Sequence, residues 1–266
     1  MKFTAAALVA VLLVFSFAGC GGGAEGDATD SLSLLVDSTQ AMTEVSGYRM
    51  SGTIAMDSGT GGQSQPISMD IRAEVQNTEG GMRQHMFVTI GDYEVEAYIV
   101  DGVYYQNLPG QGWMKMSTAA YMSQNMNLGL VDAAQMEMMA QLALDAEVVE
   151  EDEETTVISF HLDQEYLQAS LELYRQYIEE GDEQLPEEWL QMAEETITDF
   201  QADIRISLNK ADSLIKRMEM TYIMAGLPEV GEVSSSMKTD FYDYGADIEI
   251  ELPPEAAQAP EVDLGQ

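Results

Sequence analysis

The fold is decided by a stretch in which apolar and polar side chains alternate, Tyr48-Arg49-Met50-Ser51-Gly52-Thr53-Ile54-Ala55-Met56. Its even-numbered positions are apolar or small, and its odd-numbered positions are polar apart from one alanine. Because successive side chains of a β-strand point to opposite faces, this period of two predicts a strand with one buried face and one solvated face.

The same alternation recurs along most of the chain, in segments separated by short turns rich in glycine, asparagine and aspartate. We expect further strands at residues 67–75, 82–90, 93–99, 103–106, 113–116, 146–150, 155–162, 200–208, 214–224, 236–242 and 247–252. Turns such as Asp101-Gly102 are typical of hairpins. The pattern therefore predicts an antiparallel meander whose buried side is apolar.

Segments with apolar residues at helical spacing interrupt these strands. We expect a helix from Asp30 or Ser31, either of which can cap it, to about Val45. Further helices are expected at residues 119–125 and 131–144, after Asp163, and in a short piece after Pro186. This order of strands and helices indicates the α+β class, and we assign residues 31–252 to a single domain.

The N-terminal stretch indicates export and a lipid anchor. Lys2 precedes an apolar run from Phe3 to Phe17, which is shorter than the roughly 20 residues of a membrane-spanning helix. The run leads into Gly19-Cys20, and this arrangement resembles the lipobox of bacterial lipoproteins, in which the cysteine thiol is acylated before the chain is cut ahead of it. The alternative is a plain secretory peptide with a chance cysteine.

The lipobox reading divides the ends of the chain into segments. We expect a signal peptide at residues 1–19, a lipidated Cys20 followed by a flexible tether to residue 30, and a loose C-terminal tail at residues 253–266. Acyl chains such as palmitate on Cys20 would hold the domain at the membrane. The expected location is extracytoplasmic, on the outer face of the cell membrane in a bacterial envelope.

Composition and motifs exclude several classes of function. Cys20 is the only cysteine, so its acylation leaves no thiol for disulfides, thiolate metal sites or cysteine catalysis. The formal net charge of −36 repels nucleic acid, so we expect no nucleic-acid partner. The sequence has no phosphate-binding glycine loop, nucleophile elbow or metal-spaced histidine pair. We expect a monomer without cofactor or catalytic residues, with His85 and His161 at surface or partly buried positions.

The order of lipobox, tether, helix, long strands, helical insertion and further strands resembles the LolA/LppX-type lipoprotein-carrier superfamily, with its LppX/LprAFG-type members. It is also similar to uncharacterised Met-rich lipoproteins of Gram-positive bacteria with this fold. The resemblance is carried by residues 32–53 and by the hairpin from Ile204 to Met224. It implies a half-barrel, a strongly curved antiparallel sheet of about ten strands, with helices packed against its concave side. It also implies an apolar cavity between sheet and helices that holds a lipid or an acyl chain.

The leading site candidate is the apolar face of the sheet with the Met-rich helical insertion opposite it. The chain has 19 methionines, and this unbranched, polarisable side chain suits cavities that adapt to varied ligands. We expect the cavity to be lined by Met50, Ile54, Met56, Met69, Ile71, Met86, Val88, Met136, Met139, Ile204, Met218, Met220 and Tyr222. Plain core filling by the same residues is the alternative, and a half-barrel with packed and open parts accommodates both.

Two other functions stay open from the sequence. A non-carrier envelope sensor or structural module would bind a protein partner through the same fold, and its mark would be a filled half-barrel with an exposed apolar patch elsewhere. Alternatively, the thioether sulfurs of Met122, Met126, Met136, Met138 and Met139 are close enough in sequence to suggest a Cu(I) site.

Overall fold

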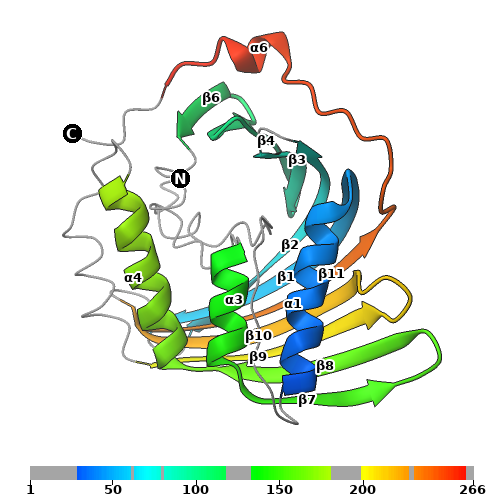
Figure 1. Ribbon diagram of the computed structural model, residues 1–266. Coiled ribbons are helices and arrows are strands. Elements are labelled where there is room, and N and C mark those ends of the chain that lie inside the picture. Colours follow the sequence, from blue (N-terminus) through cyan, green and yellow to red (C-terminus); the bar gives the residue numbers. More distant parts are fainter. Residues whose placement is uncertain are drawn as a thin grey trace.

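A curved antiparallel sheet forms the body of the protein in the computed structural model, which describes residues 29–60, 63–78, 81–117, 133–180, 199–227 and 231–261. Within these residues the sheet has 11 strands in the order β6-β5-β4-β3-β2-β1-β11-β10-β9-β8-β7. Their bounds are β1 Gly47–Thr60, β2 Gln63–Thr78, β3 Gly81–Ile90, β4 Tyr93–Val100, β5 Val103–Leu108, β6 Gly112–Ser117, β7 Leu144–Glu151, β8 Thr155–Leu162, β9 Asp199–Asn209, β10 Ile215–Leu227 and β11 Gly231–Tyr242. The sheet bends into an open half-barrel, as the family resemblance implies (Figure 1).

The two halves of the sheet come from distant parts of the chain. Strands β1 to β6 form a meander that runs outward to one edge, and the later strands run from the other edge back to β1. The seam is the antiparallel pair β1 and β11, which places Met50 opposite Phe241 and Ile54 opposite Met237. Each strand pair is antiparallel, so the inward-facing residues continue from strand to strand across the whole sheet.

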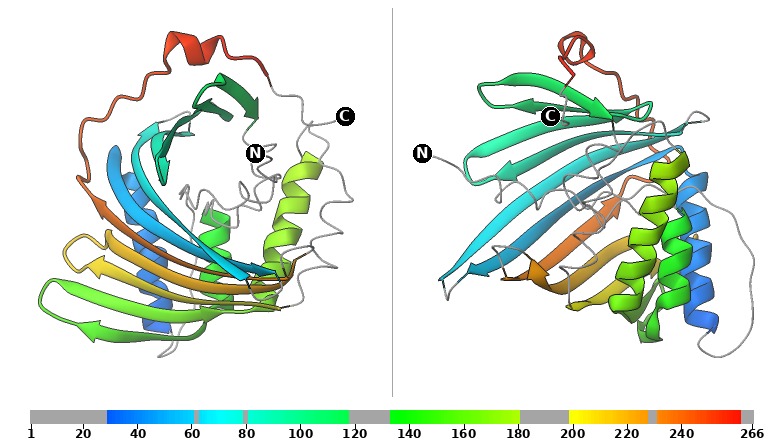
Figure 2. Two further views of the ribbon diagram at one scale, coloured as in Figure 1. Left: turned by 180° about the vertical axis from the view of Figure 1, so that it is seen from behind. Right: turned by 90° about the vertical axis from the view of Figure 1, so that its left-hand side faces the viewer.

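The helices gather against the concave side of the sheet (Figures 1 and 2). Helix α1 (Thr29–Glu44) packs beside α3 (Ala133–Leu142), and α3 packs beside α4 (Gln164–Glu180). Helix α1 also reaches β7, and α4 reaches β9. At the start of α4, the Asp163 carboxylate accepts a hydrogen bond of 2.9 Å from the N–H of Glu165, so this aspartate caps the helix as expected.

The apolar core lies between the helices and the inner face of the sheet. Buried side chains from α1, α3, α4 and the inner positions of the strands belong to one continuous cluster. In β9 the pattern is almost strict, because its residues alternate between buried and solvent-accessible along the strand. Period-2 alternation in the sequence is thus converted directly into an inner and an outer face.

One inward position of β1 requires glycine. A β-carbon on Gly52 would lie 2.5 Å from the backbone oxygen of Lys238 and 2.7 Å from the hydroxyl of Thr239. The absent side chain therefore lets β1 lie close to β11 at the seam.

The C-terminal segment differs from what we expected of it. Residues 247–252 form no strand, and residues 253–261 are ordered against the sheet instead of belonging to a loose tail. Pro254–Ala257 forms the short helix α6, Ala256 is buried, and the N–H of Lys115 donates to the carbonyl oxygen of Pro260 at 3.0 Å. This segment therefore covers the outer edge of β6, at the top of Figure 1.

The reason for this docking is an apolar patch on the outer face of β4 to β6. Ile248 and Ile250 pack with Tyr98, and Trp113 and Leu252 lie against this small cluster. Large aromatic residues occupy outward positions here, so they need a cover to be removed from water. Residues 247–252 supply that cover without strand pairing, and Pro253-Pro254 ends any extension.

Other parts of the expectation fall outside the described residues. These are the signal peptide, Cys20, most of the tether, the expected helix at residues 119–125, and the short helix after Pro186. Within the described residues, the helix expected at residues 131–144 spans Ala133–Leu142, and one residue separates its end from the start of β7. Among the described helices, none has the length and apolar character needed to cross a membrane.

Candidate ligand-binding site

The inner wall of the half-barrel brings together the residues that we expected to line a cavity. Every one of them except Met136 lies in the main apolar cluster or packs against it. The side chain of Met136 is outside the described part of the chain. Most of the set is fully buried, while Met56, Met220 and Tyr222 are partly exposed. The strands thus assemble a continuous, Met-rich apolar wall from both halves of the sheet.

A polar residue that the sequence reading did not select also faces this wall. Gln84 lies opposite Val75 on one side and Ile99 on the other, so it occupies an inward position of β3. Its relative exposure is 0%. Neither its amide nitrogen nor its amide oxygen has a hydrogen-bond partner among the described residues. The sequence pattern does place Gln84 on the inner face, since it stands between Met82 and Met86 at the two-residue spacing of inward side chains.

Two other polar residues of the wall, Tyr104 and Gln106, do have partners. The hydroxyl of Tyr104 donates to Oε1 of Gln106 at 3.3 Å, and Nε2 of Gln106 donates to the sulfur of Met114 at 3.1 Å. Register places Tyr104 of β5 opposite Ile99 of β4, which in turn lies opposite Gln84 of β3. Gln84 therefore differs from Gln106, because neither its amide nitrogen nor its amide oxygen forms a hydrogen bond among the described residues.

The phenols of the inner wall are neutral. Burial strongly raises the pKa of Tyr48, whose hydroxyl has no partner among the described residues. Burial also raises the pKa of Tyr222. Both side chains stay protonated at physiological pH because removing the proton would leave a buried, unpaired charge.

Charged side chains are separated from this wall by the thickness of the sheet. In the described parts of β1 to β6 and β8 to β11, the inward positions carry no Asp, Glu, Lys or Arg. The outer face holds ion pairs instead, such as Arg49 with Glu74 at 2.8 Å and Arg217 with Asp240 at 2.6 Å. The wall is therefore suited to uncharged groups.

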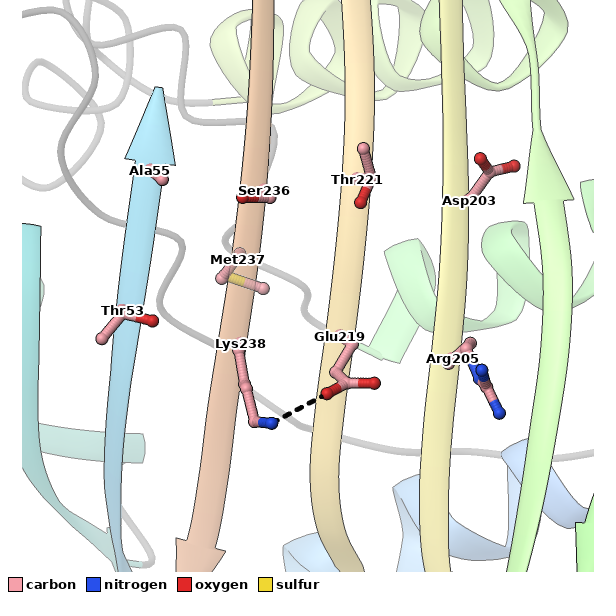
Figure 3. A pocket seen from close by; sticks show the side chains of 9 residues that line it. All are labelled: Thr53, Ala55, Asp203, Arg205, Glu219, Thr221, Ser236, Met237 and Lys238. Atoms are coloured by element: carbon pink, nitrogen blue, oxygen red, sulfur yellow. Dashed lines mark ion pairs between the residues drawn. The ribbon is translucent and has the colours of Figure 1, made fainter. Parts of the chain in front are cut away.

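A hollow on the outer face is lined by polar side chains of β1, β11, β10 and β9 (Figure 3). Its volume is about 330 Å³. Its charged groups already have partners, since Lys238 pairs with Glu219 at 3.1 Å and Arg205 pairs with Glu150 at 2.7 Å. Asp203 pairs with His161. This hollow is consistent with a solvated surface crossed by ion pairs.

The histidines lie on different strands of the outer face. The ring of His85 is partly buried and stacks on Tyr98 with centroids 4.1 Å apart, and its Nε2 is 3.0 Å from Glu96. In the described residues, no group of three or more His, Cys, Asp or Glu side chains is placed to hold a metal ion.

The thioethers considered for copper are only partly described. Met139 is buried in the apolar cluster, and Met138 packs against it. Met122, Met126 and the side chain of Met136 lie outside the described residues. The two described sulfurs therefore belong to the core side of the Met-rich helix.

Comparison with known proteins gives a family and a set of distant structural likenesses. Residues 31–261 match the family described as "Family of unknown function (DUF6612)". No curated protein matches the chain. Among solved structures, the Mycobacterium tuberculosis lipoprotein LppX is 11% identical with a TM-score of 0.46, and the alignment covers 85% of this chain and 100% of that one.

Two further structures are similar at the same distance. A putative outer membrane lipoprotein-sorting protein domain from Vibrio parahaemolyticus is 10% identical, with a TM-score of 0.33 over 84% of this chain and 95% of that one. A LolA superfamily protein from Nitrosomonas europaea is 9% identical, with a TM-score of 0.30 over 84% and 94% of the two chains. These likenesses are distant and extend to no ligand.

The unused amide of Gln84 makes a prediction about stability. Replacing it by methionine, Gln84→Met, removes a buried donor and acceptor that have no described partner, so the free energy of unfolding of lipid-free protein should rise by roughly 1–3 kcal/mol. Urea denaturation of the full chain measures this. The control Gln106→Met deletes hydrogen bonds that are made, and should lower stability by about 1 kcal/mol. A loss of stability in Gln84→Met as large as that of the control would show that the amide has a partner.

Proposed function

The chain belongs to the DUF6612 family, and we propose that its half-barrel binds the apolar part of a lipid or acyl chain against the inner wall. The observation that carries this proposal is the uncharged, Met-rich inner wall, which is assembled from both halves of the sheet while the ion pairs lie on the outer face. Methionine side chains re-pack easily around ligands of different shape. The same arrangement supports a binding protein and not an enzyme, because His85 and His161 with their carboxylate partners lie apart on the outer face.

Small residues on this wall indicate where a ligand could lie. Ala73 and Ala97 both stand opposite Met86, on its two neighbouring strands, and all three are buried. An alkyl chain seated over small side chains would gain about 0.8 kcal/mol for each methylene removed from water. A ligand of ordinary acyl length could therefore bind by apolar contact alone.

We further propose that the protein works as an anchored monomer on the outer face of a bacterial cell membrane. Support comes from the lipobox-like Gly19-Cys20 after an apolar run and from the polar tether that follows. The net charge of −36 would keep the domain from lying flat on anionic headgroups while the acyl chains hold it close to the bilayer.

A second candidate function is docking of a protein partner, and exposed apolar side chains on the edge strand β7 favour it. Leu144, Val148 and Val149 of β7 are 44%, 40% and 39% exposed. Val36 of α1 is also exposed, and α1 contacts β7. Edge strands with exposed apolar residues are common sites for partner chains. This function would use the edge of the sheet at β7, so changes to the inner wall at β4 should leave it intact.

Filling the wall tests the lipid proposal. Ala97→Met places a longer side chain where the alkyl chain would lie, so uptake of the uncharged probe diphenylhexatriene should fall several-fold, with stability changed by less than about 1 kcal/mol. Probe fluorescence and urea denaturation of delipidated full-length protein carrying Cys20→Ser measure both effects. The matched control is Ala55→Met on the outer face, which should take up the probe like the parent. No probe uptake by the parent, with Ala97→Met destabilised by about 1–3 kcal/mol through overpacking, would mean a filled core.

The anchor is tested by the cysteine itself. Cys20→Ser removes the only thiol that can be acylated, so the protein should move from the detergent phase to the aqueous phase when bacterial cells producing it are extracted with Triton X-114. Metabolic labelling with a fatty acid gives a second readout. A parent protein that carries no label and already partitions into water would contradict the anchor.

A further inference from the structure

The feature with the least structural explanation is the amide of Gln84. Buried amides in folded proteins are almost always hydrogen-bonded, because leaving one unpaired costs on the order of its desolvation. Gln84 is fully buried, and neither of its polar atoms has a partner among the described residues. A glutamine kept in such a place, on a strand whose other inward residues are apolar, indicates a partner that is not part of the described chain.

The surroundings of Gln84 define what that partner can be. Across the strands its neighbours are Val75 and Ile99, and the next inward residue along β3 is Met86. No charged side chain occupies an inward position of β1 to β6 in the described residues. The Lys and Arg side chains of these strands lie on the other face, as Arg72 does with Glu94 at 2.9 Å. A phosphate beside Gln84 would therefore be a buried charge without a cation.

The order of polar and apolar residues along the inner wall further limits what the partner of Gln84 can be. The row of Gln84 continues through Val75 to Tyr48, near the start of β1, and the apolar inward residues Met50, Ile54 and Met56 follow along that strand. Eight residues at about 3.3 Å each span roughly 26 Å. Gln84 and Tyr48 thus lie at one end of this apolar track, and Ser235 stands opposite Met56 at its other end. An amphiphile with its head beside Gln84 and Tyr48 would place its acyl chains along the apolar stretch between these two ends.

We propose that Gln84 is the polar anchor of the lipid site and that the ligand is an uncharged amphiphile whose head presents both a hydrogen-bond donor and an acceptor. The amide nitrogen donates to an ester or hydroxyl oxygen of the ligand, and the amide oxygen accepts from its hydroxyl. Its acyl chains lie along the apolar rows. This inference rests on the proposed lipid-binding function and adds the class of headgroup to it.

Competition between two lipids that share their acyl chains tests the proposal. Dioleoylglycerol and dioleoylphosphatidic acid differ only in a hydroxyl against a phosphate, and each is titrated into full-length protein carrying Cys20→Ser with bound diphenylhexatriene. Dioleoylglycerol should displace the probe at a concentration at least tenfold lower. Equal displacement by the two lipids, or preference for the phosphatidic acid, would overturn the uncharged headgroup.

The anchor residue is tested separately. Gln84→Met should raise the dioleoylglycerol concentration needed for displacement about 3- to 10-fold, the effect of one or two lost hydrogen bonds, after correction for the variant's own measured affinity for diphenylhexatriene. Gln201→Met, a glutamine on the exposed outer side of β9, is the matched control and should change neither. Unaltered dioleoylglycerol binding by Gln84→Met would refute the anchor with lipid binding intact. Failure of the parent to bind diphenylhexatriene would instead refute the proposed function itself.

Discussion

The register between β1 and β11 is the constraint on which the interior depends. This pair joins the two halves of the chain without a shift from Arg49 opposite Tyr242 to Gly59 opposite Glu232. A slip by one residue would turn the inward side chains of a whole half outward. The close approach that fixes the seam needs Gly52, because a β-carbon there would collide with the backbone of β11. The apolar wall is continuous only because this pair is in register.

A continuous wall also separates charge from the interior. The chain carries a net charge of −36, yet the described inward positions outside β7 hold neutral side chains only. Ion pairs such as Lys238 with Glu219 cross the outer face from strand to strand. Exposed pairs of this kind add little stability individually. Their placement matters more for function, because it leaves an uncharged surface on the side that faces the helices.

The strands and their inner and outer faces could be predicted from the sequence, because the alternation of apolar and polar residues indicates which residues share a face. The pairing of β1 with β11 could not be predicted, because these strands lie nearly two hundred residues apart and a local pattern does not show which distant strand pairs with which. The alternation around Ile248 and Ile250 predicts a strand. In the structure these residues instead cover the outward Tyr98 and pair with no strand. The sequence does not single out Gln84, because one polar residue among apolar neighbours does not change the pattern of a strand face. Its unpaired amide is recognised only when its neighbours in space are known.

The inner wall therefore has the properties of a site for an apolar, uncharged ligand. The most direct measurement is native mass spectrometry of the full chain purified from the cells that produce it, followed by organic extraction and lipid analysis. The account predicts a lipid in near-stoichiometric amount that carries acyl chains and no phosphate. Folded protein that is free of any extractable lipid, beyond its own covalent anchor, would contradict it.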